Sequence, residues 1–130
     1  MKMTGNVING GTVQGEAVVL GVPFSFVGDF DPETGALLIE DNGLYGKSIA
    51  DKILVCTTGK GGTVAPFIAY QAKQARTAPA AIICETAGEM LSESAILIDI
   101  PLIEGLEKSR LKMIKQGQEV SIKDGTVQVE

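Results

Sequence analysis

Apolar residues gather in short runs separated by glycine-rich segments, and this pattern predicts a mixed chain of strands and helices. Residues 13–20 begin with alternating polar and apolar positions and end as a continuous apolar run. That change is typical of a strand passing from an exposed to a buried setting. Two more short apolar runs, 52–57 and 80–84, are rich in β-branched residues or alanine and predict buried strands.

Helical patterns alternate with these strands. Residues 64–76 predict a helix, because Pro66 suits its first turn and Thr63 or a neighbour can cap its N-terminus. The apolar face expected for this helix contains Val64, Ile68, Ala72 and Ala75. Residues 85–94 are compatible with a second, short helix, and the stretch 107–115 with a third.

The remaining runs are predicted to be strands. A turn at 31–35 leads into a short strand at 36–40, and 95–103 is predicted to be a buried strand interrupted at Pro101. Two alternating runs within 119–130, joined by Asp124-Gly125, are a strong signal for a hairpin. Strand-helix units framed by antiparallel strands indicate a mixed α/β fold, layered or barrel-like.

Composition narrows the class of protein. The 130 residues are 45% hydrophobic and 21% charged, so residues 1–130 are expected to form a single domain with one substantial core. Sixteen acidic residues against 11 basic ones give a net charge of −5. Nucleic acid and anionic membranes are bound chiefly by an excess of Lys and Arg, so neither is an expected partner. Because the net charge is negative, a small anionic ligand would need a local group of hydrogen-bond donors or cations to bind it.

The chain contains no histidine, which removes the commonest general base and the commonest metal ligand. A self-contained hydrolase is therefore not expected. Cys56 and Cys84 each lie in an apolar run and are predicted to be reduced core residues of a cytoplasmic protein. Two cysteines are too few for an iron-sulfur cluster or a structural zinc site, so we expect no metal or cofactor in this chain. No signal-peptide core and no membrane-spanning run are evident.

A glycine-rich loop joins the predicted strand 52–57 to the predicted helix 64–76. Its glycines at positions 59, 61 and 62 and its lysine, Lys60, precede a helix N-terminus. Backbone N–H groups, the helix dipole and one cation can together hold a carboxylate or phosphate. The spacing matches neither the Walker A nor the Rossmann fingerprint. A tight turn without a ligand explains the glycines equally well.

A second loop, 23–35, mixes aromatic residues with glycine, proline and two carboxylates. Asp29 and Asp31 could form a catalytic pair, but a solvated surface turn is the favoured interpretation because no histidine or metal-binding spacing accompanies them. Tyr45 and Tyr70 could each donate a proton, and structural packing is favoured for both.

Four segments resemble, in order, the small swivelling subunit of the aconitase X family, over about Gly15 to Ile103. They are Pro23-Phe24-Ser25-Phe26-x-Gly28-x-x-Asp31-Pro32-x-Thr34-Gly35, Gly46-x-Ser48-Ile49-Ala50-x-Lys52-Ile53-Leu54-Val55, Gly59-Lys60-Gly61-Gly62-Thr63-Val64 and Thr77-Ala78-Pro79-Ala80-Ala81-Ile82-Ile83. The resemblance implies a swivelling β/β/α domain with a mixed, barrel-like core, related to the mobile domain of ordinary aconitases.

The resemblance also implies a function. It points to a subunit of a hydro-lyase that is inactive alone and docks onto a large aconitase X-type subunit carrying an iron-sulfur cluster or iron. The substrate would be a small anionic hydroxy acid of the mevalonate 5-phosphate or cis-3-hydroxy-L-proline class. Two alternatives stay open: a non-catalytic paralogue acting as an anion-binding or regulatory module, and a free-standing α/β domain that self-associates.

The site residues implied by the resemblance lie in the two loops. They are Ser25, Phe26, Gly28, Gly59, Lys60, Gly61, Gly62 and Thr63. The family's proposed proton-abstracting serine falls on Gly62, which has no side chain. The adjacent hydroxyl, that of Thr63, could take this role only if the loop backbone were reset. Asp29 stands where the family commonly has glycine, which puts a negative charge beside a site expected to receive an anion.

Overall fold

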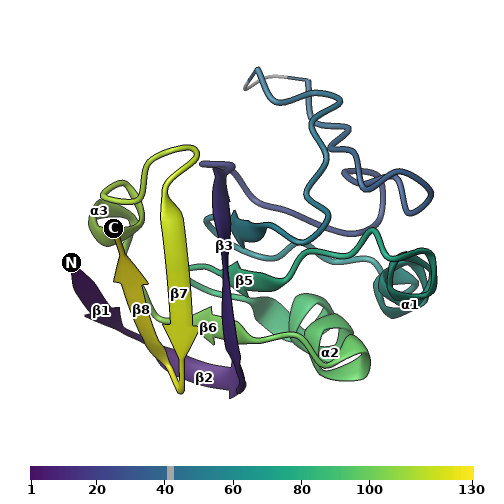
Figure 1. Ribbon diagram of the computed structural model, residues 1–130. Coiled ribbons are helices and arrows are strands. Elements are labelled where there is room, and N and C mark those ends of the chain that lie inside the picture. Colours follow the sequence, from purple (N-terminus) through teal and green to yellow (C-terminus); the bar gives the residue numbers. More distant parts are fainter. Residues whose placement is uncertain (41–42) are drawn as a thin grey trace.

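The computed structural model describes residues 1–40 and 43–130 and has a mixed α/β fold (Figure 1). The strands are β1 (Lys2–Thr4), β2 (Asn6–Asn9), β3 (Thr12–Val19), β4 (Ile53–Val55), β5 (Ala81–Ile83), β6 (Leu102–Glu104), β7 (Glu119–Lys123) and β8 (Thr126–Val129). The helices are α1 (Ala65–Ala75), α2 (Gly88–Ile98) and α3 (Lys108–Leu111). The predicted strands 13–20, 52–57 and 80–84, the helix 64–76 and the C-terminal hairpin are thus confirmed.

All the strands of the described residues belong to one sheet, in the order β1-β8-β7-β3-β4-β5-β6-β2. β3, β4, β5 and β6 are parallel, and the strands flanking them pair antiparallel. The two ends of this order, β1 and β2, are joined in sequence by Gly5 alone, so the sheet curls into a nearly closed barrel. A Cβ at Gly5 would lie 2.6 Å from the carbonyl oxygen of Glu104, so only glycine fits this junction.

β3 belongs to both halves of the sheet. Its first part pairs antiparallel with β7, from Thr12 to Glu16, and its last part pairs parallel with β4, from Ala17 to Val19. This explains the change in its sequence from alternating to continuously apolar, because only the second part is covered on both faces.

Alternate residues of the parallel strands face two separate cores. One core lies beneath α1 and α2 and includes Val18, Leu54 and Ile82. The other lies beneath the antiparallel hairpin and includes Ala17, Ile53 and Ile83. Figure 1 shows α1 and α2 together on one side of the parallel strands and the β7–β8 hairpin on the other.

The predicted strand at 95–103 is largely wrong. Residues up to Ile98 form the end of α2, and β6 begins only at Leu102. Within this run Ala95 and Ile98 are buried, whereas Ile96 and Leu97 are 53% and 55% exposed, which is the spacing of a helix. A short, wholly apolar run carries no period that separates a buried strand from a helix.

Three smaller predictions also need correction. The predicted strand 36–40 is absent from the described residues: Ala36 and Leu37 form only isolated bridges, and residues 41–42 beyond it lie outside the described ranges. The predicted helix 107–115 shortens to the four residues of α3. In α1 the buried residues are Ala65, Ala69 and Ala72, while Val64 and Ala75 are exposed, and no side chain caps its N-terminus at Val64.

Candidate functional site

The loops that follow β3 and β4 meet at the carboxyl edge of the parallel strands. The Phe24 N–H donates to the Thr58 carbonyl at 2.9 Å, and the Lys60 N–H donates to the Phe24 carbonyl at 2.9 Å. The structure therefore brings together the Phe24–Phe30 loop and the glycine loop, 59–63. This edge is where α/β sheets with parallel strands commonly bind ligands.

Ser25 ties these two loops together. It is only 3% exposed, its hydroxyl donates to the Gly61 carbonyl at 3.3 Å, and the same oxygen accepts the Val27 N–H at 3.0 Å. Both contacts stay within the loops, so Ser25 sets their relative position.

Phe26 is buried in the core. It is 1% exposed and packs edge-on against Phe24 and Phe30, with ring centroids 5.2 and 5.3 Å apart. These aromatic contacts anchor the loop to the molecule. In this structure Phe26 can influence a ligand only through the shape of the loop that it holds.

The glycines of the two loops have different physical reasons to be glycine. A Cβ on Gly59 would lie 1.9 Å from the Ala87 carbonyl oxygen, so close packing requires this residue. Gly61 meets no atom within 4 Å of a Cβ, and Gly28, at φ +86°, is equally open. Gly62 has φ +130°, and its Cβ would lie 3.1 Å from Val27 Cγ2 and 3.7 Å from Ser25 Oγ. Close packing thus explains Gly59 and positive φ explains Gly28 and Gly62, whereas neither explains Gly61.

Consecutive amides of the glycine loop are free to bind an anion. Within residues 1–40 and 43–130, no protein atom accepts a hydrogen bond from the N–H groups of Gly61, Gly62 and Thr63. They lead directly into α1, a helix of 11 residues, whose dipole favours negative charge at this end. Thr63 is exposed, and no hydrogen bond in the described part of the chain holds its hydroxyl.

The lysine of the loop is already engaged. Lys60 Nζ lies 2.8 Å from Asp29 Oδ2, with side-chain exposures of 49% and 14%. The same carboxylate oxygen accepts the Ser25 N–H at 3.0 Å. Asp29 therefore belongs to the site, where it offsets the one cation that the glycine loop contributes.

The other polar candidates lie apart from this arrangement. Asp31 accepts the Glu33 N–H at 2.9 Å, which confirms the interpretation of this carboxylate as part of a turn. Tyr45 and Tyr70 are 60% and 51% exposed, so the expectation that both pack into the structure is wrong.

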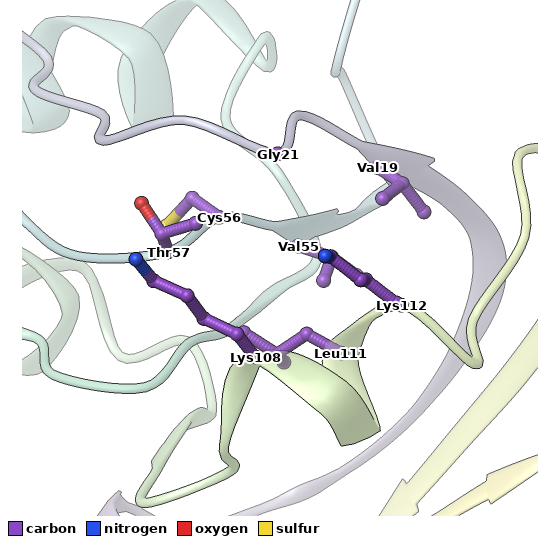
Figure 2. Close-up of a pocket in the computed structure, with 8 residues that line it drawn as sticks. All are labelled: Val19, Gly21, Val55, Cys56, Thr57, Lys108, Leu111 and Lys112. Atoms are coloured by element: carbon purple, nitrogen blue, oxygen red, sulfur yellow. The ribbon is translucent and has the colours of Figure 1, made fainter.

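A cavity of about 270 Å³ lies near the glycine loop, and sequence reasoning missed it (Figure 2). Its lining consists of Val19, Gly21, Val55, Cys56, Thr57, Lys108, Leu111 and Lys112. The available signal was the pair Lys108 and Lys112, spaced one helical turn apart beside a buried leucine.

The sequence matches the aconitase X swivel domain over residues 2–130. The chain belongs to this family. It is 43% identical to the phosphomevalonate dehydratase small subunit of Thermococcus kodakarensis over 112 residues, or 86% of this chain and 84% of that one. The protein of the same name from Methanosarcina mazei is 39% identical over 94% of this chain and 85% of its own length.

A solved structure shows the same fold. The crystal structure of Thermococcus kodakaraensis aconitase X in its holo-form superimposes with a TM-score of 0.92 and 38% identity, covering 100% of this chain and 98% of that one. The α/β fold with a barrel-like sheet, expected from the resemblance to aconitase X, is confirmed.

This aconitase X swivel domain offers no ligand set for a metal in its described residues: no group of three or more Cys, Asp or Glu side chains comes together there. Cys56 and Cys84 are buried free thiols. Hydrogen bonding to Cys84 and burial raise the pKa of the Cys56 thiol well above its ordinary value. Within the same residues, no helix has the length and apolar character needed to cross a membrane.

Proposed function

We propose that this protein is the small subunit of an aconitase X-type hydro-lyase that removes water from mevalonate 5-phosphate. One observation carries the proposal: relatives named phosphomevalonate dehydratase small subunit share 39–43% of their residues with this chain over most of its length. Residues 1–130 would act as one swivelling unit in the cytoplasm, inactive without its partner.

The glycine loop would hold an anionic group of the substrate. The free N–H groups of Gly61, Gly62 and Thr63 can donate to phosphate or carboxylate oxygens, and Lys60 can add a charge-assisted hydrogen bond. Lys60 must then share its ammonium between Asp29 and the substrate. In this proposal Ser25 is a positioning residue, because within the described residues its hydroxyl hydrogen-bonds only the Gly61 carbonyl and the Val27 N–H.

The proton chemistry requires a second chain. Dehydration of a hydroxy acid needs a base beside the carbon that loses its proton and a group that assists departure of the hydroxyl. Gly62 has no side chain, the Thr63 hydroxyl is exposed and has no partner base among the described residues, and the protein contains no histidine. The family resemblance assigns iron or an iron-sulfur cluster to the large subunit, and the described residues here contain no cluster that fits one. This chain would therefore bind the substrate, and the large subunit would supply the groups that move the proton and release the hydroxyl.

An exposed apolar surface beside the glycine loop suits the large subunit. Val27, Val64 and Phe67 are 36%, 48% and 71% exposed, and Val27 contacts the position where a side chain of residue 62 would lie. Apolar groups gathered on a surface commonly mark an interaction site. A partner covering this surface would also close over the loop.

Co-expression with the large subunit of the same organism tests the proposal. We expect the two chains to purify together and the complex, but neither chain alone, to dehydrate mevalonate 5-phosphate in preference to cis-3-hydroxy-L-proline. Failure of the chains to associate would overturn the subunit role. Activity on the proline substrate alone would overturn the substrate assignment.

A non-catalytic, anion-binding paralogue is the second candidate. Two observations favour it: the site lacks a side chain at Gly62, and Asp29 already neutralises Lys60. A complex that assembles and binds mevalonate 5-phosphate without dehydrating it would select this alternative.

A further inference from the structure

The cavity in Figure 2 has the chemistry of a second anion site, distinct in its residues from the glycine loop. None of its lining residues is acidic, although the whole chain carries a net charge of −5. Lys108 and Lys112 both line it from α3 and the residue that follows, and the Lys112 N–H donates to the Lys108 carbonyl at 3.0 Å. The two side chains therefore project from the same side of one helical turn.

Among residues 1–40 and 43–130, no carboxylate neutralises the ammonium group of Lys108 or Lys112. Within the part of the chain that the structure describes, ion pairs involve Lys52 and Lys60, while Lys108 and Lys112 have no carboxylate partner. Figure 2 shows both lysine side chains reaching across the cavity toward β4 and the residues that follow it. Two like charges over one cavity repel each other, and a bound dianion would relieve that repulsion.

The rest of the cavity lining is mostly apolar, and hydrogen bonds hold a neighbouring segment in place. Val19, Val55 and Leu111 line it, Cys56 closes it at 1% exposure, and Thr57 offers a hydroxyl. The Gln116 side-chain amide exchanges two hydrogen bonds with the backbone of Val19, which anchors the neighbouring segment to β3. An apolar lining with a few polar groups is the usual composition of a small-molecule site.

We propose that this cavity binds a small phosphomonoester with a short aliphatic chain, its phosphate between Lys108 and Lys112 and its chain against Val19, Val55 and Leu111. Its volume of about 270 Å³ is sufficient for a phosphate and a few carbon atoms. The cavity shares no residue with the loops of the proposed catalytic site. Thr57, which lines the cavity, lies two residues before Gly59, the first residue of the glycine loop.

The test titrates the full, isotopically labelled chain with 3-methylbutyl phosphate, inorganic phosphate and 3-methylbutanol, following backbone amide shifts by NMR. We expect the alkyl phosphate to shift Val19 and Leu111 and to bind at least about tenfold more tightly than phosphate, because its chain is buried. Lys108→Gln with Lys112→Gln should weaken this binding by about tenfold or more. Lys47→Gln with Lys123→Gln removes the same charge elsewhere and should leave it unchanged.

Each contrary result would overturn the second site. Shifts confined to Gly59–Thr63 would place the anion at the glycine loop, which leaves the proposed function intact. Equal loss of binding in both double variants would indicate a general charge effect. If the Lys108/Lys112 variant lost association with the large subunit while retaining alkyl phosphate binding, the two lysines would belong to a protein interface instead.

Discussion

Asp29 Oδ2 lies 2.8 Å from Lys60 Nζ and 3.0 Å from the Ser25 amide nitrogen, so a single carboxylate oxygen links the two loops of the site. The ion pair is partly exposed, and such pairs contribute only about 0–1 kcal/mol to stability. The ion pair has a larger effect on ligand binding, because the negative charge of Asp29 repels a substrate anion that approaches Lys60.

Replacing Asp29 by asparagine should strengthen anion binding. The asparagine side chain keeps an oxygen for the Ser25 N–H but removes the charge, so we expect the KM of the complex for mevalonate 5-phosphate to fall about threefold. Asp31→Asn is the matched control, because Asp31 accepts the Glu33 N–H in the same loop. Equal KM changes in both variants would show that Asp29 has no specific effect on the site.

Gly62→Ser should lower the free energy of unfolding, because the serine side chain would strain the loop. At φ +130°, with Val27 Cγ2 3.1 Å from the new Cβ, the substitution should cost about 1–3 kcal/mol in the free energy of unfolding. Val27→Ala in the same chain should recover part of that loss. Chemical denaturation of the native chain and the single and double variants measures it, and equal stability of Gly62→Ser and the native chain would contradict the strain.

The same double variant tests the chemistry of the site. A serine at 62 would lie near Ser25, whose hydroxyl oxygen is 3.7 Å from the new Cβ. Because the proposed base lies on the large subunit and Ser25 is no base for a serine at 62, we expect the dehydration rate of the reconstituted complex to stay within about threefold of the native rate. A rise of about tenfold or more would show that this loop can supply the proton acceptor. A fall in rate would show instead that the active site of this protein requires glycine at position 62.

Gly59→Ala and Gly61→Ala should have different effects on stability although both residues lie in one loop, and chemical denaturation of the two variants measures the difference. The Gly59 Cβ would lie 1.9 Å from the Ala87 carbonyl oxygen, so this variant should lose about 3 kcal/mol or more of unfolding free energy. Gly61 has open space, and its variant should unfold within about 0.5 kcal/mol of the native chain. Equal destabilisation of the two would contradict the loop geometry.

Phe67→Ser should weaken assembly without weakening the fold. Phe67 is 71% exposed, so its removal costs the isolated chain little, whereas a partner covering it would lose about 1.5–3 kcal/mol, or roughly tenfold or more in Kd. Leu97→Ser on α2 is the control, an apolar residue of 55% exposure on a different helix. Weaker assembly of the Leu97 variant with unchanged assembly of the Phe67 variant would move the interface to α2.

The Cys56 thiol should be inert in the folded protein and should make stability fall at high pH. Contact with Cys84 and burial raise its pKa, so the native thiol stays protonated at pH values where the unfolded thiol ionises. The contribution of the Cys56 thiol to the free energy of unfolding is therefore complete below about pH 8.5, the ordinary thiol pKa, and it declines as the pH rises above that value. Cys56→Ala should flatten that decline in denaturation curves between about pH 8 and 10, and native Cys56 should react with a thiol reagent only on unfolding.

Local sequence was sufficient wherever neighbouring residues settle the conformation. The hairpin at Asp124-Gly125, the buried strands ending at Val55 and Ile83, and the glycine loop before α1 all follow from turn chemistry and apolar runs. The family resemblance also identified the two loops that lie together. The run Ala95–Ile98 was misassigned because four apolar residues fit a buried strand and a helix equally well.

Contacts between distant residues depended on the tertiary structure. The closure of β1 and β2 through Gly5, the pairing of Asp29 with Lys60, and the cavity between β4 and α3 each join segments far apart in the chain. The sequence could place Asp29 and Gly62 as departures from the family pattern. Only the folded chain, by bringing the ends of the parallel strands to one edge, decided that Asp29 engages the lysine and that Gly62 adopts a backbone conformation suited to glycine.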